Sequence, residues 1–265
     1  MQALADKISG VLLLNKPSGI TSNRALQICK RLIKVKKAGH AGTLDPLATG
    51  MLPICIGQAT KFSQYLLGAN KTYTVTAQLG VTTDTGDSEG VLVSQVAVTD
   101  FTRDKLLSVL DKFKGDIQQI PPMYSALKQD GKKLYELARQ GITVDRKERD
   151  VKIINLEVKS TTRDSFTLTV TCSKGTYIRS LVEDIGNELG YGAHVVQLSR
   201  DSIEALPDKM ITIEQLENLQ DKVSVLHPIE NLLLDFKDIT IDEHNTQKIL
   251  WGQTVTGLPK IQEFN

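Results

Sequence analysis

The chain has 265 residues, of which 40% are hydrophobic and 24% charged, and its formal net charge is +1. These values suit one large globular domain, alone or with a small appendage, and exclude a polycation, so any affinity for nucleic acid must come from charge gathered on one face. The three cysteines and four histidines are widely spaced, which predicts a reduced protein without disulfides or a metal site. The apolar run at residues 11–14 is too short for a signal peptide or a membrane span.

The first elements of the chain are predicted from its apolar pattern and turn residues. Residues 9–14 predict a short buried strand, which residues 15–19 end. Thr21 or Ser22 then caps a predicted helix that runs to about Ile33. The end of this helix is basic, with Lys30, Arg31, Lys34, Lys36 and Lys37. Such charges either form a solvated helix end, which complements the helix dipole, or bind phosphate groups.

The next stretch, residues 39–50, reads GHAGTLDPLATG. Its three glycines and one proline exclude a regular helix or a central strand, so we expect a loop. Asp45 lies near its centre, and Pro46 biases the Asp45 backbone to an extended or turn conformation. A lone Asp-Pro pair usually forms an Asx turn. Here, however, His40 lies in the same loop, whose glycines allow close approach of another backbone, including that of a nucleic acid.

Short elements continue beyond this loop. The pattern predicts a strand at 51–56, a helix at 58–67, a strand at 71–79, a loop at 82–90 and a helix from Thr102 to about Phe113. Tyr73 falls on the apolar face of the predicted strand, where a tyrosine is usually a core residue.

The second half of the chain begins with a basic stretch, residues 119–152, which a Pro-Pro pair interrupts. Within it, residues 131–139 have the apolar spacing of a helix. Its charges form a solvated face unless they bind RNA. Paired strands are then predicted at 151–158 and 165–172, followed by a helix that begins near Tyr177 and a strand at 193–200.

Four of these segments resemble the motifs of one family. They are LLLNKPSGITSN at residues 12–23, GHAGTLDPLATG at 39–50, KTYTVTAQLG at 71–80 and KGTYIR at 174–179. The family is the pseudouridine synthases of the TruB type, the bacterial tRNA pseudouridine-55 synthases, and the resemblance covers about residues 9–230. It implies an α+β fold in which a mixed, mostly antiparallel sheet is flanked by helices and loops.

The resemblance also implies a domain organisation. Residues 1–230 correspond to a catalytic domain, and residues 231–265 resemble the start of a small RNA-binding domain of the PUA-like kind, which they are too few to complete. Residues 119–152 resemble a mobile inserted element that clamps the RNA loop in the bacterial tRNA branch. This likeness argues against the branch of the family that acts inside guide-RNA particles.

Roles for single residues follow from the same resemblance. Asp45 is the essential catalytic residue, and Arg179 pairs with it. The other implied roles are a ring against the RNA for His40, stacking on the target base for Tyr73, the walls of the uracil pocket for Tyr177 and Leu198, and support beside the site for Lys16.

The implied reaction breaks the bond between ribose C1′ and uracil N1 and joins C5 to C1′. It needs no redox change, phosphoryl donor or metal, so we expect no cofactor. Asp45 acts either by covalent attack on the sugar or by deprotonating it, and for both it must be ionised. Arg179 favours the charged form, whereas desolvation opposes it. Tyr73 is also a candidate general base late in the reaction.

The expected partner is the T-stem-loop of tRNA, from which the target uridine must be flipped at a cost of a few kcal/mol. No membrane or metal partner is expected, and we expect a cytoplasmic monomer. One alternative is a tRNA-binding or tRNA-folding protein in which the catalytic residues are incidental. Another is a glycosidase with Asp45 as its nucleophile, although the matching motifs provide no evident second carboxylate for that chemistry.

Overall fold

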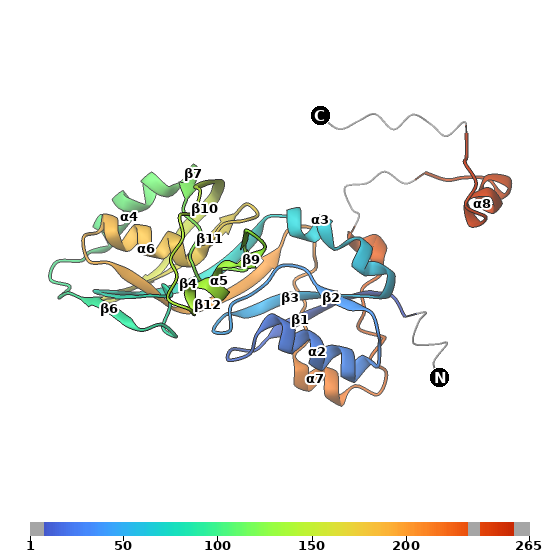
Figure 1. Cartoon of the computed structure of the whole chain (residues 1–265), viewed down its shortest axis with the longest axis horizontal. Coiled ribbons are helices and arrows are strands. Elements are labelled where there is room, and N and C mark those ends of the chain that lie inside the picture. The colour runs from blue at the N-terminus through green and yellow to red at the C-terminus, as the bar shows by residue number, and fades with distance from the viewer. Residues whose placement is uncertain (1–7, 233–238, 257–265) are drawn as a thin grey trace. The chain divides into compact units, whose positions relative to one another are not determined.

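The computed structural model describes residues 8–232 and 239–256, and the chain divides into two compact units, residues 1–232 and 233–265 (Figure 1). The first unit contains the central sheet and the helices packed on it. In its described part, the second unit forms one helix, α8 (Glu243–Leu250), which is capped by the side chain of Asp242. No helix within the described ranges is long and apolar enough to cross a membrane.

The central sheet has eight strands in the described part of the chain. They are β1 (Gly10–Lys16), β2 (Ala38–His40), β3 (Thr49–Ile56), β4 (Lys71–Leu79), β7 (Gly115–Gln119), β10 (Arg149–Thr161), β11 (Ser165–Cys172) and β12 (Ala193–Ile203). Their order is β1-β3-β12-β4-β11-β10-β7, with β2 paired to β3 off this path, and the pairing of β12 with β3 is the parallel one. The expected α+β fold with a mixed, mostly antiparallel sheet is therefore confirmed.

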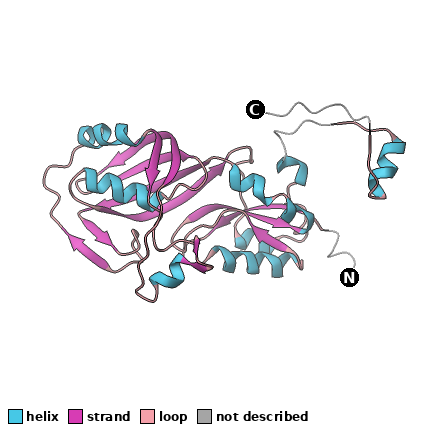
Figure 2. Ribbon diagram, turned by 45° about the horizontal axis from the view of Figure 1, so that its top comes forward, coloured by secondary structure: helices cyan, strands magenta, loops and turns pink. Residues whose placement is uncertain are grey.

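Smaller elements complete the chain. Two hairpins form from β5 (Val81–Thr83) with β6 (Leu92–Gln95) and from β8 (Lys128–Gln129) with β9 (Lys132–Lys133). The other helices are α2 (Ser22–Ile33), α3 (Ser63–Gly68), α4 (Arg103–Leu110), α5 (Leu134–Ala138), α6 (Ile178–Glu188) and α7 (Ile213–Asn218), and the 3₁₀ turns are η1 (Gly57–Lys61), η2 (Asp111–Phe113) and η3 (Ile229–Leu232). Figure 2 shows the strands of the first unit with helices beside them.

The predicted helix α2 is present, with the N-terminal cap and the buried apolar face that its sequence predicts. The Thr21 side chain accepts a hydrogen bond from the Arg24 N–H and caps the first turn. Ala25, Cys29 and Ile33 are buried on one face, and α2 packs against β2, β3 and α7. The alternation predicted for β4 and β11 is also present: every second residue is buried in β11, and in β4 the same holds except at Tyr73, which is partly buried.

Some predicted boundaries were wrong. Residues 58–67 are not one helix, because the chain breaks at Phe62 between η1 and α3. Residues 39–50 are not wholly a loop: β2 takes in Gly39 and His40, and β3 begins at Thr49. Residues 82–83 likewise belong to β5. In each strand, pairing with a distant segment overrides the local preference of glycine and polar residues for turns.

The inserted stretch is shorter than the range 119–152 that was predicted from the sequence. Gln119 at the end of β7 pairs directly with Arg149 at the start of β10. Residues 120–148 therefore form an excursion between two adjacent antiparallel strands, and they contain the β8–β9 hairpin and α5. We call residues 120–148 the insertion. Its Leu134 and Leu137 are buried, so the excursion has apolar anchors of its own.

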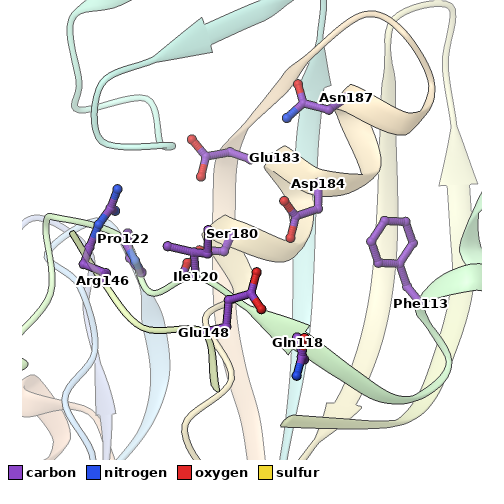
Figure 3. A pocket seen from close by; sticks show the side chains of 10 residues that line it. All are labelled: Phe113, Gln118, Ile120, Pro122, Arg146, Glu148, Ser180, Glu183, Asp184 and Asn187. Atoms are coloured by element: carbon purple, nitrogen blue, oxygen red, sulfur yellow. The ribbon is translucent and has the colours of Figure 1, made fainter. Parts of the chain in front are cut away.

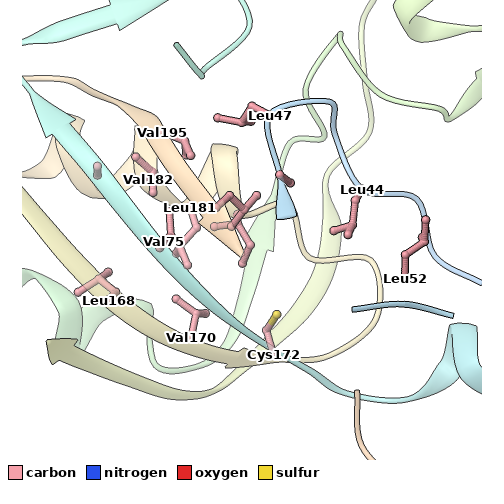
Figure 4. Packing of buried hydrophobic residues seen from close by; sticks show 14 of the residues in the cluster. Leu44, Leu47, Leu52, Val75, Leu168, Val170, Cys172, Leu181, Val182 and Val195 are labelled. Atoms are coloured by element: carbon pink, nitrogen blue, oxygen red, sulfur yellow. The ribbon is translucent and has the colours of Figure 1, made fainter. Parts of the chain in front are cut away.

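The apolar core extends into the predicted catalytic loop. Figure 4 shows Leu44 and Leu47 of this loop in the same cluster as Val75 of β4 and Leu181 of α6. Leu44 is 4% exposed and Leu47 8% exposed. Because these leucines are buried on either side of Asp45, the loop is anchored to the core both before and after the aspartate.

Candidate active site

The loop that carries Asp45 lies where one edge of β3 changes its partner. β1 pairs along one edge of β3. On the other edge, β12 pairs with residues 49–50 and β2 pairs with residues 54–56. Residues 51–53 lie between these pairings, and we call this place the sheet fork. The loop at residues 41–48 leaves β2 and enters β3 beside it.

Side chains from the first motif hold the residues on either side of Asp45. The Ser22 Oγ accepts a hydrogen bond from the Leu44 N–H at 2.8 Å and donates one to the Leu44 carbonyl at 2.9 Å. The fully buried Lys16 donates from Nζ to the Pro46 carbonyl at 3.1 Å. The backbone before and after Asp45 is thus fixed, which limits the positions open to its carboxylate.

The structure pairs Asp45 with Arg179. Arg179 Nε lies 2.9 Å from Asp45 Oδ2, and Nη1 lies 3.6 Å from Asp87 Oδ2. Arg179 also donates hydrogen bonds of 2.7 Å to the carbonyls of Thr85 and Tyr124. One guanidinium at the start of α6 therefore joins the catalytic loop, the loop after β5 and the insertion.

The ionisation of Asp45 is set by opposing effects. Burial is the largest of these and raises the pKa of Asp45, and the Asp87 carboxylate acts in the same direction. Arg179 and Lys16 oppose the rise, and the net shift is upward. The Asp45 side chain keeps 33% of its exposure, whereas that of Arg179 keeps 4%. Asp45 is accordingly the member of the pair that a substrate can reach.

Burial of Lys16 next to this carboxylate disfavours the charged form of the lysine. Burial lowers the pKa of Lys16 to about 8, although the charges of Asp45 and Glu89 oppose the shift. Besides Pro46, the Lys16 Nζ donates to the carbonyls of Pro17 and Ile20. The ammonium is thus held by three backbone carbonyls, which fits the supporting place expected from the sequence.

The other predicted site residues lie on strands that meet near the fork. His40 ends β2, and its buried Nδ1 has no hydrogen-bond partner in the described part of the chain. Burial lowers the pKa of His40, and the Arg200 charge lowers it further, so the ring is neutral at pH 7. Tyr73 lies on β4 opposite Arg200 of β12, and the buried Leu198 lies opposite Val75. Burial raises the pKa of Tyr73.

Tyr177 occupies the position before the first turn of α6. Its N–H donates to Gln119 Oε1 at 3.0 Å, and its carbonyl accepts from Gln119 Nε2 at 3.3 Å. Gln119 is buried, so both bonds are shielded from water. They hold the Tyr177 backbone against the end of β7. Burial raises the pKa of the Tyr177 hydroxyl.

Four residues of this arrangement were not predicted as site residues: Ser22, Asp87, Gln119 and Arg200. Ser22 lies in a segment that already resembled a family motif and Asp87 in the predicted loop at 82–90, but their side chains looked like ordinary cap and turn residues. Arg200 had a sequence signal, because it lies two positions after Leu198 in a predicted strand and so shares its inward face.

The described residues contain no group of three or more His, Cys, Asp or Glu side chains that could hold a metal ion. The three cysteines, Cys29, Cys55 and Cys172, are free and buried. Burial raises the pKa of each thiol, to about 12 for Cys29 and about 11 for the other two. They are therefore neutral core residues rather than ligands or nucleophiles.

A separate pocket lies between α6, the insertion, η2 and β7 (Figure 3). It is lined by Phe113, Gln118, Ile120, Pro122, Arg146, Glu148, Ser180, Glu183, Asp184 and Asn187. Three carboxyl groups in this lining make it unsuitable for the phosphate backbone of RNA. None of the site residues predicted from the sequence lines it.

Comparison with known proteins decides the family. A model of the TruB family pseudouridylate synthase N-terminal domain matches residues 30–178, and a model of the tRNA pseudouridylate synthase B C-terminal domain matches residues 179–234. The chain belongs to the TruB family. This membership confirms the family predicted from the sequence motifs.

Individual relatives agree with this membership. A tRNA pseudouridine synthase B from Marinomonas sp. (strain MWYL1) is 49% identical and aligns with 94% of this chain and 82% of its own length. A protein of the same name from Tolumonas auensis is 56% identical over 80% of this chain, which spans 65% of that relative. A solved chain of a Cbf5-Nop10-Gar1 complex has 28% identity and a TM-score of 0.68, covering 87% of this chain and 63% of its own.

Proposed function

We propose that this chain converts uridine 55 in the T-loop of tRNA to pseudouridine, and that Asp45 is the group that acts on the ribose. It is an isomerase of tRNA, as its family and the relatives named tRNA pseudouridine synthase B indicate. A related solved structure, an H/ACA RNP bound to a substrate RNA containing 2′-deoxyuridine, supports RNA as the substrate class. The observation that carries the role of Asp45 is its 2.9 Å contact with the buried Arg179.

The chemistry follows from the position of this pair. The bond from C1′ to N1 of the uridine breaks, the base rotates, the bond from C1′ to C5 forms, and the C5 proton leaves while N1 gains one. Asp45 starts the sequence by attack on C1′ or by removal of a sugar proton. Arg179 stabilises its carboxylate form against the burial that opposes ionisation. The reaction is redox-neutral and balances without a cofactor.

The remaining residues bind the flipped uridine. Stacking on the Tyr73 ring contributes about 1–3 kcal/mol, which offsets much of the few kcal/mol that flipping costs. Tyr177 and Leu198 form the walls of the uracil pocket. His40, with a neutral ring, lies against the bases that remain in the RNA. The raised pKa of Tyr73 keeps its hydroxyl protonated, which argues against a role for Tyr73 as the general base late in the reaction.

The insertion clamps the T-stem-loop. Support comes from its hydrogen bond to Arg179 through the Tyr124 carbonyl and from its Lys and Arg residues between 128 and 147. RNA bound to the insertion would thereby act on Arg179, the residue that pairs with Asp45. Residues 1–230 act as the catalytic domain, and residues 231–265 belong to a small RNA-binding region of the PUA-like kind. The protein works as a monomer without a metal, and its place is the cytoplasm, which the three buried free cysteines and the tRNA substrate favour.

A glycosidase is less well supported. The fold does bring a second carboxylate, Asp87, close to Arg179. However, Asp87 is 4% exposed, and its Oδ1 already accepts from the Thr85 hydroxyl and the Glu89 N–H. A carboxyl group that is held in this way cannot serve as the mobile acid and base that glycoside hydrolysis requires.

The test follows tritium release from a tRNA transcript labelled at uracil C5. We expect the wild type to release label without added metal or cofactor. Asp45→Asn should bind the RNA with nearly unchanged affinity and release essentially none. Asp111→Asn, which changes an exposed aspartate of η2, serves as the matched control and should keep full activity. Tight binding by the wild type without label release would instead favour an RNA-binding protein.

A further inference from the structure

Arg200 occupies the sheet fork. It is the largest of the fully buried side chains in the described part of the chain, with 1% exposure. In β12 it pairs with Gly50 of β3 on one side and with Tyr73 of β4 on the other. It thus lies where the strands of the catalytic loop meet the strand that carries the expected stacking ring.

The Arg200 guanidinium fills the gap that the fork leaves between strands. Its Nε donates to the Met51 carbonyl at 2.7 Å, and its Nη2 donates to the Gly42 carbonyl at 2.9 Å. Gly42 has a φ of +85°, and a Cβ there would lie 3.1 Å from Arg200 Nη1. The catalytic loop therefore approaches this guanidinium as closely as a glycine permits.

The charge of Arg200 has no acidic partner. No carboxylate of the described residues lies within 4.0 Å of its guanidinium, which forms none of the ion pairs found there. Instead its charge acts on two of the expected site residues: it opposes the rise in the pKa of Tyr73, which lies opposite it on β4, and it lowers the pKa of His40. Burial of an unpaired charge is costly, and such departures from stable packing tend to occur at functional sites.

We propose that Arg200 is a positioning residue of the isomerisation, which sets the distance between the loop of Asp45 and the ring of Tyr73. Its guanidinium bonds the Gly42 carbonyl of the loop, and its backbone lies directly opposite Tyr73 in the pairing of β12 with β4. The sugar carbon to be attacked and the flipped base belong to one nucleotide, so the two protein parts must be fixed relative to each other. This inference rests on the proposed function.

An arginine is required for this task, and a lysine is not equivalent. The guanidinium presents N–H donors in a fixed fork, so it holds the Met51 and Gly42 carbonyls in different directions at once. An ammonium on a flexible stem holds them one at a time and without a fixed plane. Arg200→Lys should therefore keep the charge but lose most of the positioning.

The experiment compares Arg200→Ala and Arg200→Lys with the wild type in the full chain. A single-turnover tritium-release assay gives the rate of the chemical step, and titration of the labelled tRNA gives the dissociation constant. We expect the rate for Arg200→Ala to fall about 100-fold, as for a misplacement of reacting groups by about 1 Å. The dissociation constant should change less than about threefold, because Arg200 does not touch the RNA surface.

Lys71→Ala is the matched control. Lys71 is also a buried cation of this sheet, 7% exposed, but its Nζ bonds the carbonyls of Leu66 and Leu67 near the end of α3 rather than the catalytic loop. We expect Lys71→Ala to lower the unfolding midpoint in urea and to leave the single-turnover rate unchanged. If Arg200→Ala behaves in the same way, Arg200 is only structural and the proposal is wrong.

Chemical rescue separates positioning from general loss of structure. Guanidinium ion, added well below denaturing concentrations, should restore part of the rate of Arg200→Ala, whereas sodium at equal ionic strength should not. If Arg200→Ala does not fold, Arg200→Lys decides, and a wild-type rate for that variant overturns the proposal. Failure of the proposed function is a different result, since the wild type itself would then release no tritium.

Discussion

At the scale of single residues, Ser22 is the clearest support of the catalytic loop. Its hydroxyl bonds both backbone polar groups of Leu44, the residue before Asp45. Ser22→Ala leaves a buried N–H and a buried carbonyl unpaired, which should cost about 1–3 kcal/mol of unfolding free energy. Because the loop is then less fixed, we expect the single-turnover rate to fall about tenfold. Urea denaturation and tritium release measure the two effects.

Ser63→Ala provides the comparison for this change. The Ser63 hydroxyl donates to the Thr60 carbonyl at 3.1 Å, in the segment of η1 and α3 and away from the loop. The substitution should leave the rate unaltered. If Ser22→Ala turns over like the wild type, then Leu44 and Leu47 hold the loop without help from the serine.

The raised pKa of Asp45 makes the reaction sensitive to acid. Asp45 must be ionised to act, and burial shifts its pKa above that of an ordinary aspartate, about 3.9. The single-turnover rate should therefore rise with pH through a midpoint above that value. The sign for stability is opposite, since ionising a group whose folded pKa is raised disfavours the folded state. A pH profile of the wild type, measured with saturating enzyme, tests the position of the midpoint.

Asp87→Asn tests the cause of part of this shift. The Asp87 carboxylate is a like charge that raises the pKa of Asp45. Removing it should move the midpoint of the rate profile to lower pH, provided that Arg179 stays in place. A midpoint that moves to higher pH would mean that Asp87 chiefly orients Arg179, and that the ion pair with Asp45 has weakened.

At the scale of elements, the contact of β3 with β12 is the narrow connection of the sheet, since these strands share two paired positions. Gly50 makes the contact possible: its φ is +95°, and a Cβ there would lie 2.3 Å from the Arg200 carbonyl oxygen. Gly50→Ala must shift one strand. We expect a loss of several kcal/mol in unfolding free energy and an inactive enzyme, measurable by urea denaturation and tritium release.

Gly190→Ala separates the clash from the backbone conformation. Gly190 has a φ of +84°, and no atom lies within 4 Å of the position that its Cβ would take. This change should cost only about 1–2 kcal/mol, the usual penalty for a left-handed residue other than glycine. If Gly50→Ala and Gly190→Ala lose the same unfolding free energy, then β3 and β12 can move apart without destabilising the fold.

The elements also show what the sequence could predict. The helix α2 and the strands β4 and β11 follow from local capping and alternation. The three-residue strand β2 does not, because it forms by pairing with β3 and no local pattern of its own marks it. Likewise, Asp45 and Arg179 are far apart in the chain, and only the family resemblance predicted that they meet. For Arg200 the sequence marks the inward face of a predicted strand, but it does not mark the distant backbone carbonyls that hold the buried charge.

At the scale of the whole molecule, a net charge of +1 conceals a strong separation of charge. Residues 8–83 contain nine Lys and Arg residues and a single acid, Asp45 itself, whereas residues 84–265 contain 22 Lys and Arg and 29 Asp and Glu. The part of the chain that builds the catalytic loop is therefore positive around one functional carboxylate. A polyanion such as RNA is drawn to that part and repelled by much of the remainder.

This separation predicts how binding depends on salt. The affinity of Asp45→Asn for tRNA should fall steeply and log-linearly as salt rises, because each phosphate contact adds about 0.7–0.9 to the slope. Lys36 and Lys37 are exposed between α2 and β2, so replacing both with alanine should lower the slope by about 1–2 units.

The control replaces Lys105 and Lys114 with alanine, since both are already paired with acids of their own region. Their removal should leave the slope unchanged. If instead the two double variants lose the same slope, the RNA is held by the general field of the protein, and the positive segment that precedes the catalytic loop has no special part in binding.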